Sequence, residues 1–251
     1  MKNFPTSSDP YRALLVGGFA IAAALLFVTT QANAQSPDHG HAQTLSFFQA
    51  EQFEYRSGKS GGTVKWDAQG WIGTDDDKFW FKTEGERPVK GPFEQAELQL
   101  LYSWRISDFF DAQAGVRYDY KPSPQRSFGV LGIQGLAPYF FEIDGAVFLS
   151  HRGELSARFK GSYDLLITQR LILQPAAELN LALQDVKTRG VGRGLSDIEL
   201  GLRLRYEIAR EFAPYIGVNW DRKFGNTASF ARSDGDSTSS FSLVAGIRFW
   251  F

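Results

Sequence analysis

From Leu45 onward, apolar and polar side chains alternate through one long stretch of chain after another. In residues 94–106 the apolar side chains occupy the even positions from 96 onward, and the odd positions are almost all polar or charged. Residues 198–208 follow the same rule. Alternation this long is typical of β-strands, because a helix with about 3.6 residues per turn would scatter these side chains around its axis. The pattern therefore predicts an all-β chain.

Twelve segments carry this alternation. Together they would fill well over half of the chain after residue 34, which is unusual for a soluble domain, where strands take about a fifth to a quarter of the residues, but normal for a barrel. The predicted strands are 45–56, 63–73, 78–86, 94–107, 110–120, 127–136, 140–150, 154–169, 171–185, 196–209, 212–224 and 239–251.

The direction in which the apolar face points separates a soluble barrel from a membrane barrel. A lipocalin-like barrel has an apolar interior, whereas a membrane barrel has a polar lumen and an apolar belt. Three observations favour the membrane barrel. Most of the strands reach the roughly 9 to 11 residues that a tilted crossing needs, aromatic residues gather near strand ends as in interfacial girdles, and the polar face carries charges of both signs that a dry core could not hold unpaired. The sequence thus predicts a transmembrane antiparallel β-barrel of about 12 strands.

The connections between the predicted strands alternate in length. Tight turns fall at 107–108, 136–138, 168–170 and 209–211, and longer loops fall between them, up to 225–238. Short periplasmic turns and longer extracellular loops are the outer-membrane arrangement, and an even number of strands places both termini in the periplasm. The last strand alternates up to a terminal Phe251, which resembles the C-terminal recognition strand of bacterial outer-membrane proteins.

The first 34 residues have the layout of a secretory signal peptide. Lys2 and Arg12 precede an apolar run at 13–28, which is followed by Ala32-Asn33-Ala34. Cleavage is expected before Gln35, and the alternative is an uncleaved anchor. Residues 35–44 have no apolar period and are expected to form a short flexible periplasmic tail, which leaves 45–251 as the barrel.

Composition excludes several functions. The chain has no cysteine, which excludes a thiol nucleophile and thiolate metal sites. With 27 basic and 28 acidic residues and no basic stripe, nucleic acid is not an expected partner. Ser150 and His151 are adjacent and could seed a hydrolase, but catalysis would also need a third orienting group and an oxyanion site. We therefore expect no enzymatic activity.

The polar face of the predicted barrel offers the main candidate site. Its charges favour two interpretations: a lattice of ion pairs that braces the strands, or a lining that selects cations, since carboxylate rings attract them. We take Asp67, Glu84, Glu142 and Asp144 as candidate metal ligands in the lumen. In the tail, His39 and His41 are an alternate-residue pair whose imidazoles could share a copper or zinc ion, although a solvated tail is the simpler interpretation.

Several strings along these strands resemble the copper resistance protein B family. They include WDAQGWIG at 66–73, AELQLLYS at 96–103, LAPYFFEID at 136–144, GLSDIELGLRLRYEI at 194–208 and REFAPYIGVNW at 210–220. The resemblance covers roughly 63–251. It implies an outer-membrane β-barrel of Gram-negative bacteria that binds or passes copper ions at the cell surface, in contact with membrane lipid and with periplasmic copper-resistance proteins.

This chain departs from the family in one respect. Family members often carry a stretch rich in Met and His before the barrel, whereas 35–44 contains two His and no Met, and the only Met in the chain is Met1. Thioether ligation of copper is therefore absent after signal cleavage. The alternative function is a general passive pore or a structural outer-membrane barrel without tight metal binding.

Overall fold

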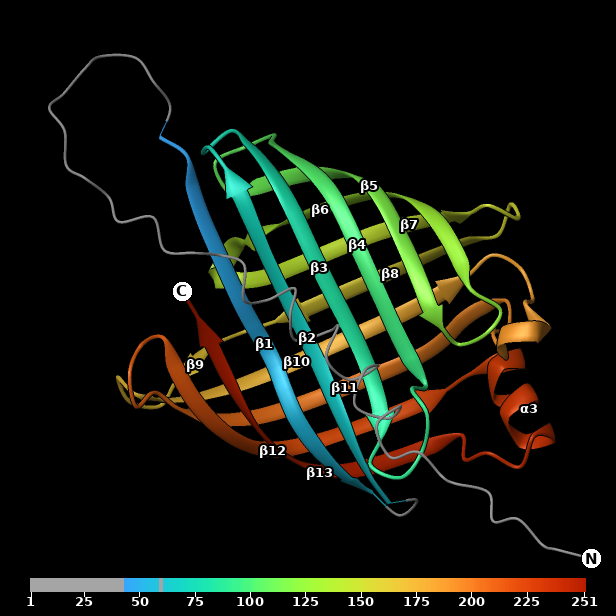
Figure 1. The fold of residues 1–251 in the computed structure, drawn as a ribbon. Coiled ribbons are helices and arrows are strands. Elements are labelled where there is room, and N and C mark those ends of the chain that lie inside the picture. Colours follow the sequence, from blue (N-terminus) through green and yellow to red (C-terminus); the bar gives the residue numbers. More distant parts are fainter. Residues whose placement is uncertain (1–42, 59–60) are drawn as a thin grey trace, which may run out of the picture. The chain divides into compact units, whose positions relative to one another are not determined.

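The computed structural model describes residues 43–58 and 61–251, and these form one antiparallel β-sheet closed into a barrel (Figure 1). Successive crossings are hydrogen-bonded neighbours, and the first strand pairs with the last to close the sheet. The strands are β1 (Leu45–Gly58), β2 (Gly61–Gly73), β3 (Asp77–Pro88), β4 (Gln95–Arg105), β5 (Phe110–Lys121), β6 (Arg126–Ala137), β7 (Phe141–Ser150), β8 (Leu155–Ser162), β9 (Leu165–Leu166), β10 (Leu171–Ala182), β11 (Gly194–Tyr206), β12 (Phe212–Lys223) and β13 (Ser239–Trp250).

The described strands occupy twelve positions around the barrel, as the alternation predicts. β8 and β9 are two parts of one crossing, because both pair with β10 and only Tyr163 and Asp164 lie between them. The predicted strand ends agree with the observed ones to within a few residues. The predicted signal peptide, and the tail up to Ala42, lie outside the described residues.

The outer surface of the barrel carries an apolar belt. Leu100 of β4 pairs with Val116 of β5, and Leu131 of β6 pairs with Val147 of β7. These four side chains are exposed, by 45% to 66%. Because alternate residues of a strand point to opposite faces, the residues on either side of them face the lumen. This is the arrangement of a membrane barrel, with the apolar face towards lipid.

The inner wall is not uniformly polar. Trp80, Leu101, Val130 and Phe148 pack together inside the barrel on β3, β4, β6 and β7, and none is more than 8% exposed. Since β6 also presents Leu131 to the outside, it is apolar on both faces around Val130, while Gln134 further along the strand lines the inner cavity. Period two therefore separates the two faces of this strand poorly.

The two ends of the barrel differ in their connections. The end that holds residue 45 and the C-terminus has turns of three to five residues, whereas the other end carries the 11-residue and 15-residue loops at 183–193 and 224–238. Those loops contain η3 (Lys187–Arg189) and the helix α3 (Gly225–Ser233). The sequence predicts only a polar loop at 225–238, because a nine-residue helix leaves too little periodic signal. Within the residues that the structure describes, no helix is long and apolar enough to cross a bilayer.

Candidate ion pathway in the barrel lumen

Two cavities occupy the lumen in the described part of the chain. The inner cavity, of about 170 Å³, reaches Glu142 and Ser162 towards the short turns. The outer cavity, of about 530 Å³, reaches Arg189 and Ser237 in the long loops. Seven residues line both cavities and therefore stand between them. We call this group the septum, and it consists of Lys65, Glu84, Glu97, Phe148, Arg158, Glu178 and Glu199.

Ion pairs hold the septum together across the barrel. Arg158 Nη1 lies 2.9 Å from a Glu97 oxygen and 3.2 Å from Glu84, and its Nε lies 3.3 Å from Glu178. Lys65 Nζ lies 2.9 Å from Glu199. The Arg158 guanidinium also lies over the Phe148 ring, 5.8 Å from its centroid. The septum is thus a charged partition with an aromatic edge.

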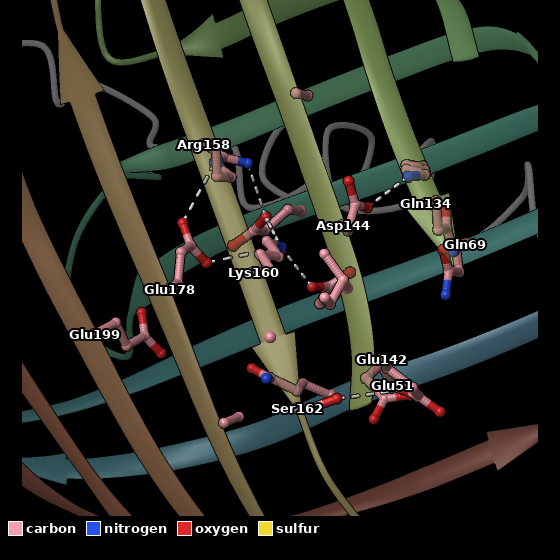
Figure 2. Close-up of a pocket in the computed structure, with 18 of the residues that line it drawn as sticks. Glu51, Gln69, Gln134, Glu142, Asp144, Arg158, Lys160, Ser162, Glu178 and Glu199 are labelled. Carbon is pink, nitrogen blue, oxygen red and sulfur yellow. Dashed lines mark hydrogen bonds and ion pairs between the residues drawn. The ribbon is translucent and has the colours of Figure 1, made fainter. Parts of the chain in front are cut away.

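Lys160 lies on the inner side of the septum, among three carboxylates. Its Nζ is 2.7 Å from Glu84, 2.9 Å from Asp67 and 3.7 Å from Glu178. Lys160 is on β8, while Asp67 and Glu84 come from β2 and β3 on the far side of the sheet order. Figure 2 shows Lys160 and Arg158 next to Glu178, with dashed lines marking the ion pairs. These contacts span the lumen and do not follow one strand pair.

A second network braces β1 against β11 and β12. Glu54, which is 1% exposed, accepts hydrogen bonds from Arg56 Nε at 2.7 Å, Arg203 Nε at 2.9 Å and the Tyr215 hydroxyl at 2.9 Å. Arg56 also donates to Glu199 at 2.5 Å, which joins this network to the septum. A buried carboxylate with these donors is fully paired, as a buried charge requires.

The 183–193 loop lines the outer cavity with Val186, Arg189 and Val191. Arg189 of η3 pairs with Asp119 of β5 at 2.7 Å. Asp185 accepts the backbone N–H of Arg193 at 2.6 Å and the Asn226 amide at 3.1 Å. These hydrogen bonds hold the pKa of Asp185 below its usual range, and the bond from the Arg193 N–H has the largest effect. The loop is therefore fixed both to the barrel wall and to α3.

The predicted lumen ligands fall into two places. Asp67 and Glu84 are cross-strand partners in β2 and β3, and both bind Lys160. Asp144 pairs with Lys82 at 2.6 Å, and Glu142 accepts a hydrogen bond from the Ser162 hydroxyl at 3.3 Å. Figure 2 shows Glu142 beside Glu51 in the inner cavity. Among the described residues, no three His, Asp or Glu side chains are grouped to hold a metal ion. His39 and His41 lie outside the described residues.

Ser150 and His151 form no catalytic pair in the structure. The Ser150 hydroxyl donates to Glu154 at 2.8 Å, while His151 Nδ1 lies 3.3 Å from the backbone oxygen of Ser127. The base and the hydroxyl thus have different partners.

Sequence reasoning missed part of the buried network. Glu54 and Arg56 face the lumen because β1 contains a bulge between Ala50 and Gln52. A bulge inserts one residue and changes which alternate set points inward. The available signal lies after the bulge, where Glu54 and Arg56 alternate with Phe53 and Tyr55, but it is out of phase with the residues before the bulge.

Comparison with known proteins gives the family. The family model described as copper resistance protein B precursor matches residues 44–251. The copper resistance protein B of Escherichia coli is 46% identical over 201 residues, which cover 80% of this chain and 68% of the relative. A copper resistance protein B homolog of Pseudomonas syringae pv. tomato is 42% identical over 206 residues, which cover 82% and 70%.

A solved structure gives independent support for the fold. The NanC porin covers 82% of this chain and 99% of its own with a TM-score of 0.51, at 13% identity, so it is similar in fold alone. Together with the strand pattern and the family match, this makes the chain an outer-membrane β-barrel. By the family match and by both relatives, the chain belongs to the copper resistance protein B family.

Proposed function

We propose that this barrel acts in copper resistance and binds or passes copper ions through its polar lumen. Membership of the family and the charge of the inner cavity support the proposal. Carboxylates outnumber basic side chains on that lining, and an excess of carboxylates attracts cations. The acidic residues are Glu51, Asp67, Glu84, Glu97, Glu142, Asp144, Glu178 and Glu199, and the basic residues are Lys65, Lys82, Arg158, Lys160 and Arg203.

The available ligands favour weak, exchangeable binding. The chain has no Cys, and its only Met is the first residue, so soft sulfur ligands for Cu(I) are absent. Carboxylate and amide oxygens remain in the lumen, and imidazoles remain at His39 and His41. Nitrogen and oxygen sites bind Cu(II) more strongly than the other divalent ions of its row. We therefore propose that Asp67, Glu84, Glu142 and Asp144 contact copper transiently.

Gene deletion tests the copper role directly. A deletion strain is expected to stop growing at copper concentrations that the parent tolerates, and its cell-associated copper is expected to differ from that of the parent. Plasmid-borne wild-type protein should restore both, and a parallel zinc series controls for general envelope damage. Unchanged tolerance together with unchanged cellular copper would contradict the proposal.

A second candidate is a passive or structural barrel without tight metal binding. It is favoured by the basic partners that Asp67, Glu84 and Asp144 already have in Lys160 and Lys82. Titration of the purified barrel with Cu(I) and Cu(II), repeated after removal of residues 35–44, distinguishes the candidates. Binding that survives this removal supports a lumen site, binding that disappears supports the tail, and no binding supports the passive barrel.

A further inference from the structure

The contacts of Lys160 differ from those of the other basic residues near the septum. Arg158 is fixed by two hydrogen bonds to Glu97, at 2.9 and 3.0 Å, and by one to Asn180 at 3.2 Å. Lys65 is buried, with a side chain 7% exposed. The Lys160 side chain is 28% exposed, and its partners within 4 Å are carboxylates. Among the basic side chains that line the inner cavity, Lys160 is the most exposed.

We propose that Lys160 determines which cations cross the lumen. Its ammonium group occupies the place between Asp67, Glu84 and Glu178 that a passing cation would enter, and so it keeps the septum closed to monovalent ions. The proposal deepens the proposed function, because the ion that displaces it there is copper. The test below uses potassium and does not depend on copper.

The geometry suits a displaceable plug. The three carboxylates come from β2, β3 and β10, so they converge without sharing a strand. A lysine ammonium is a compact charge on a flexible stem, unlike the planar guanidinium of Arg158, which fits its carboxylate partner in a fixed orientation. Lys160 can therefore swing towards the inner cavity without breaking the pairs made by Arg158 and Lys65.

Charge decides which ion can displace it. The Coulomb energy between an ion and a carboxylate scales with the ion's charge, so a divalent ion gains about twice as much as a monovalent ion at the same distance. The tethered ammonium is itself monovalent and is present at a high effective concentration, because it cannot diffuse away. Potassium would thus compete poorly for the carboxylates, whereas a divalent ion would compete well.

Planar-bilayer recording of the purified full-length protein tests this. In KCl the wild type is expected to conduct little. Lys160→Met should raise the conductance severalfold and move the reversal potential in a KCl gradient towards that of potassium, because three carboxylates lose a partner. The matched control is Lys78→Met, which removes a lysine of β3 that pairs with Asp111 at 2.7 Å and lines neither cavity.

Two further variants keep the test decisive. Lys160→Arg retains the positive charge, so this variant should conduct as little as the wild type. Lys160→Gln removes the charge but keeps a hydrogen-bond donor, and it replaces Lys160→Met in the test if that variant does not fold. Folding is checked by heat-modifiable migration on gels. The proposal is overturned if folded Lys160→Met or Lys160→Gln protein is as silent as the wild type, or if Lys78→Met conducts equally well. Either result leaves a copper role of the barrel untouched.

Discussion

Individual charges inside the barrel are held by more than one partner, and Glu54 is the strongest case. It is 1% exposed and bonded to Arg56, Arg203 and Tyr215. Breaking a buried pair by removing one partner leaves a charge in a place where water cannot reach it. Such residues therefore make the rigid inner frame on which the septum depends.

Glu54→Gln is expected to destabilise the folded barrel by about 3 to 5 kcal/mol, because Arg203 keeps its charge while only 3% exposed. Urea unfolding of the refolded protein in detergent, followed by tryptophan fluorescence, measures this as a lower midpoint. The control is Glu211→Gln in an exposed turn, which should stay within about 0.5 kcal/mol of the wild type. Equal midpoints for both variants would mean that the Glu54 network does not stabilise the barrel.

At the same scale, the sequence predicts which charges line the lumen better than it predicts their partners. Alternation alone assigns Asp67 and Glu84 to the polar face. That Lys160 reaches carboxylates on β2 and β3 depends on the closure and tilt of the whole sheet, and alternation along a strand contains no information about either. The ion-pair partners therefore could not be predicted from the sequence, even where the face of the strand was predicted correctly.

Among the elements, the strands are the most predictable and the long loops the least. The alternation of apolar and polar residues predicts the twelve membrane-crossing strands, because each strand has one face towards lipid and one towards the lumen. The bulge in β1 and the helix α3 escape this rule. The bulge shifts the alternation by one residue, and α3 packs Ala228 and Ala231 into the loop region through contacts that no local pattern reports.

The 183–193 loop is expected to loosen in acid. The pKa of Asp185 is lowered in the folded state. The ionised carboxylate therefore stabilises the loop fully above the ordinary pKa of an aspartate, about 4. This stabilisation is lost as the pH falls through the lower pKa of the folded state. Hydrogen exchange of the Arg193 amide, corrected for the intrinsic pH dependence of exchange, should show protection that falls over this range. Asp185→Ala should remove the protection at every pH.

Asp108→Ala, in a turn at the opposite end of the barrel, is the matched control and should leave the protection of Arg193 as in the wild type. If Arg193 kept its protection in Asp185→Ala, the carboxylate would not be the group that fixes the loop.

The closing strand depends on its last residue. The Phe251 N–H donates to Phe48 O at 3.0 Å, Phe48 N–H donates to Phe251 O at 2.9 Å, and the two rings stack with centroids 5.1 Å apart. Deleting Phe251 removes both bonds at the seam between β1 and β13, so the fraction of folded barrel in outer-membrane preparations should fall. Phe251→Tyr keeps the backbone and the ring and should assemble normally. Normal assembly of the truncated protein would contradict this role.

On the scale of the whole molecule, the character of the lumen varies both around the wall and along the barrel axis. An apolar cluster around Trp80 and Phe148 lies against the wall on β3, β4, β6 and β7, while charged networks join β1, β2, β8, β10 and β11 to Glu84 of β3 and Glu97 of β4. Along the axis, the septum separates a small inner cavity from a larger outer one. A cation that crosses the lumen must therefore pass the septum.

If the lumen carries the copper function, the inner carboxylates should matter more than the tail. In the described part of the chain Glu142 has no ion-pair partner within 4 Å, and the Asp144 side chain is 31% exposed, so Glu142→Gln with Asp144→Asn removes two negative charges without touching the septum. This double variant should fold but restore copper tolerance only partly in a deletion strain. A protein lacking residues 35–44 should restore it fully, and so should the control Asp111→Asn, whose residue lines neither cavity. The opposite result, with full tolerance from the double variant and none without the tail, would move the copper site from the lumen to His39 and His41.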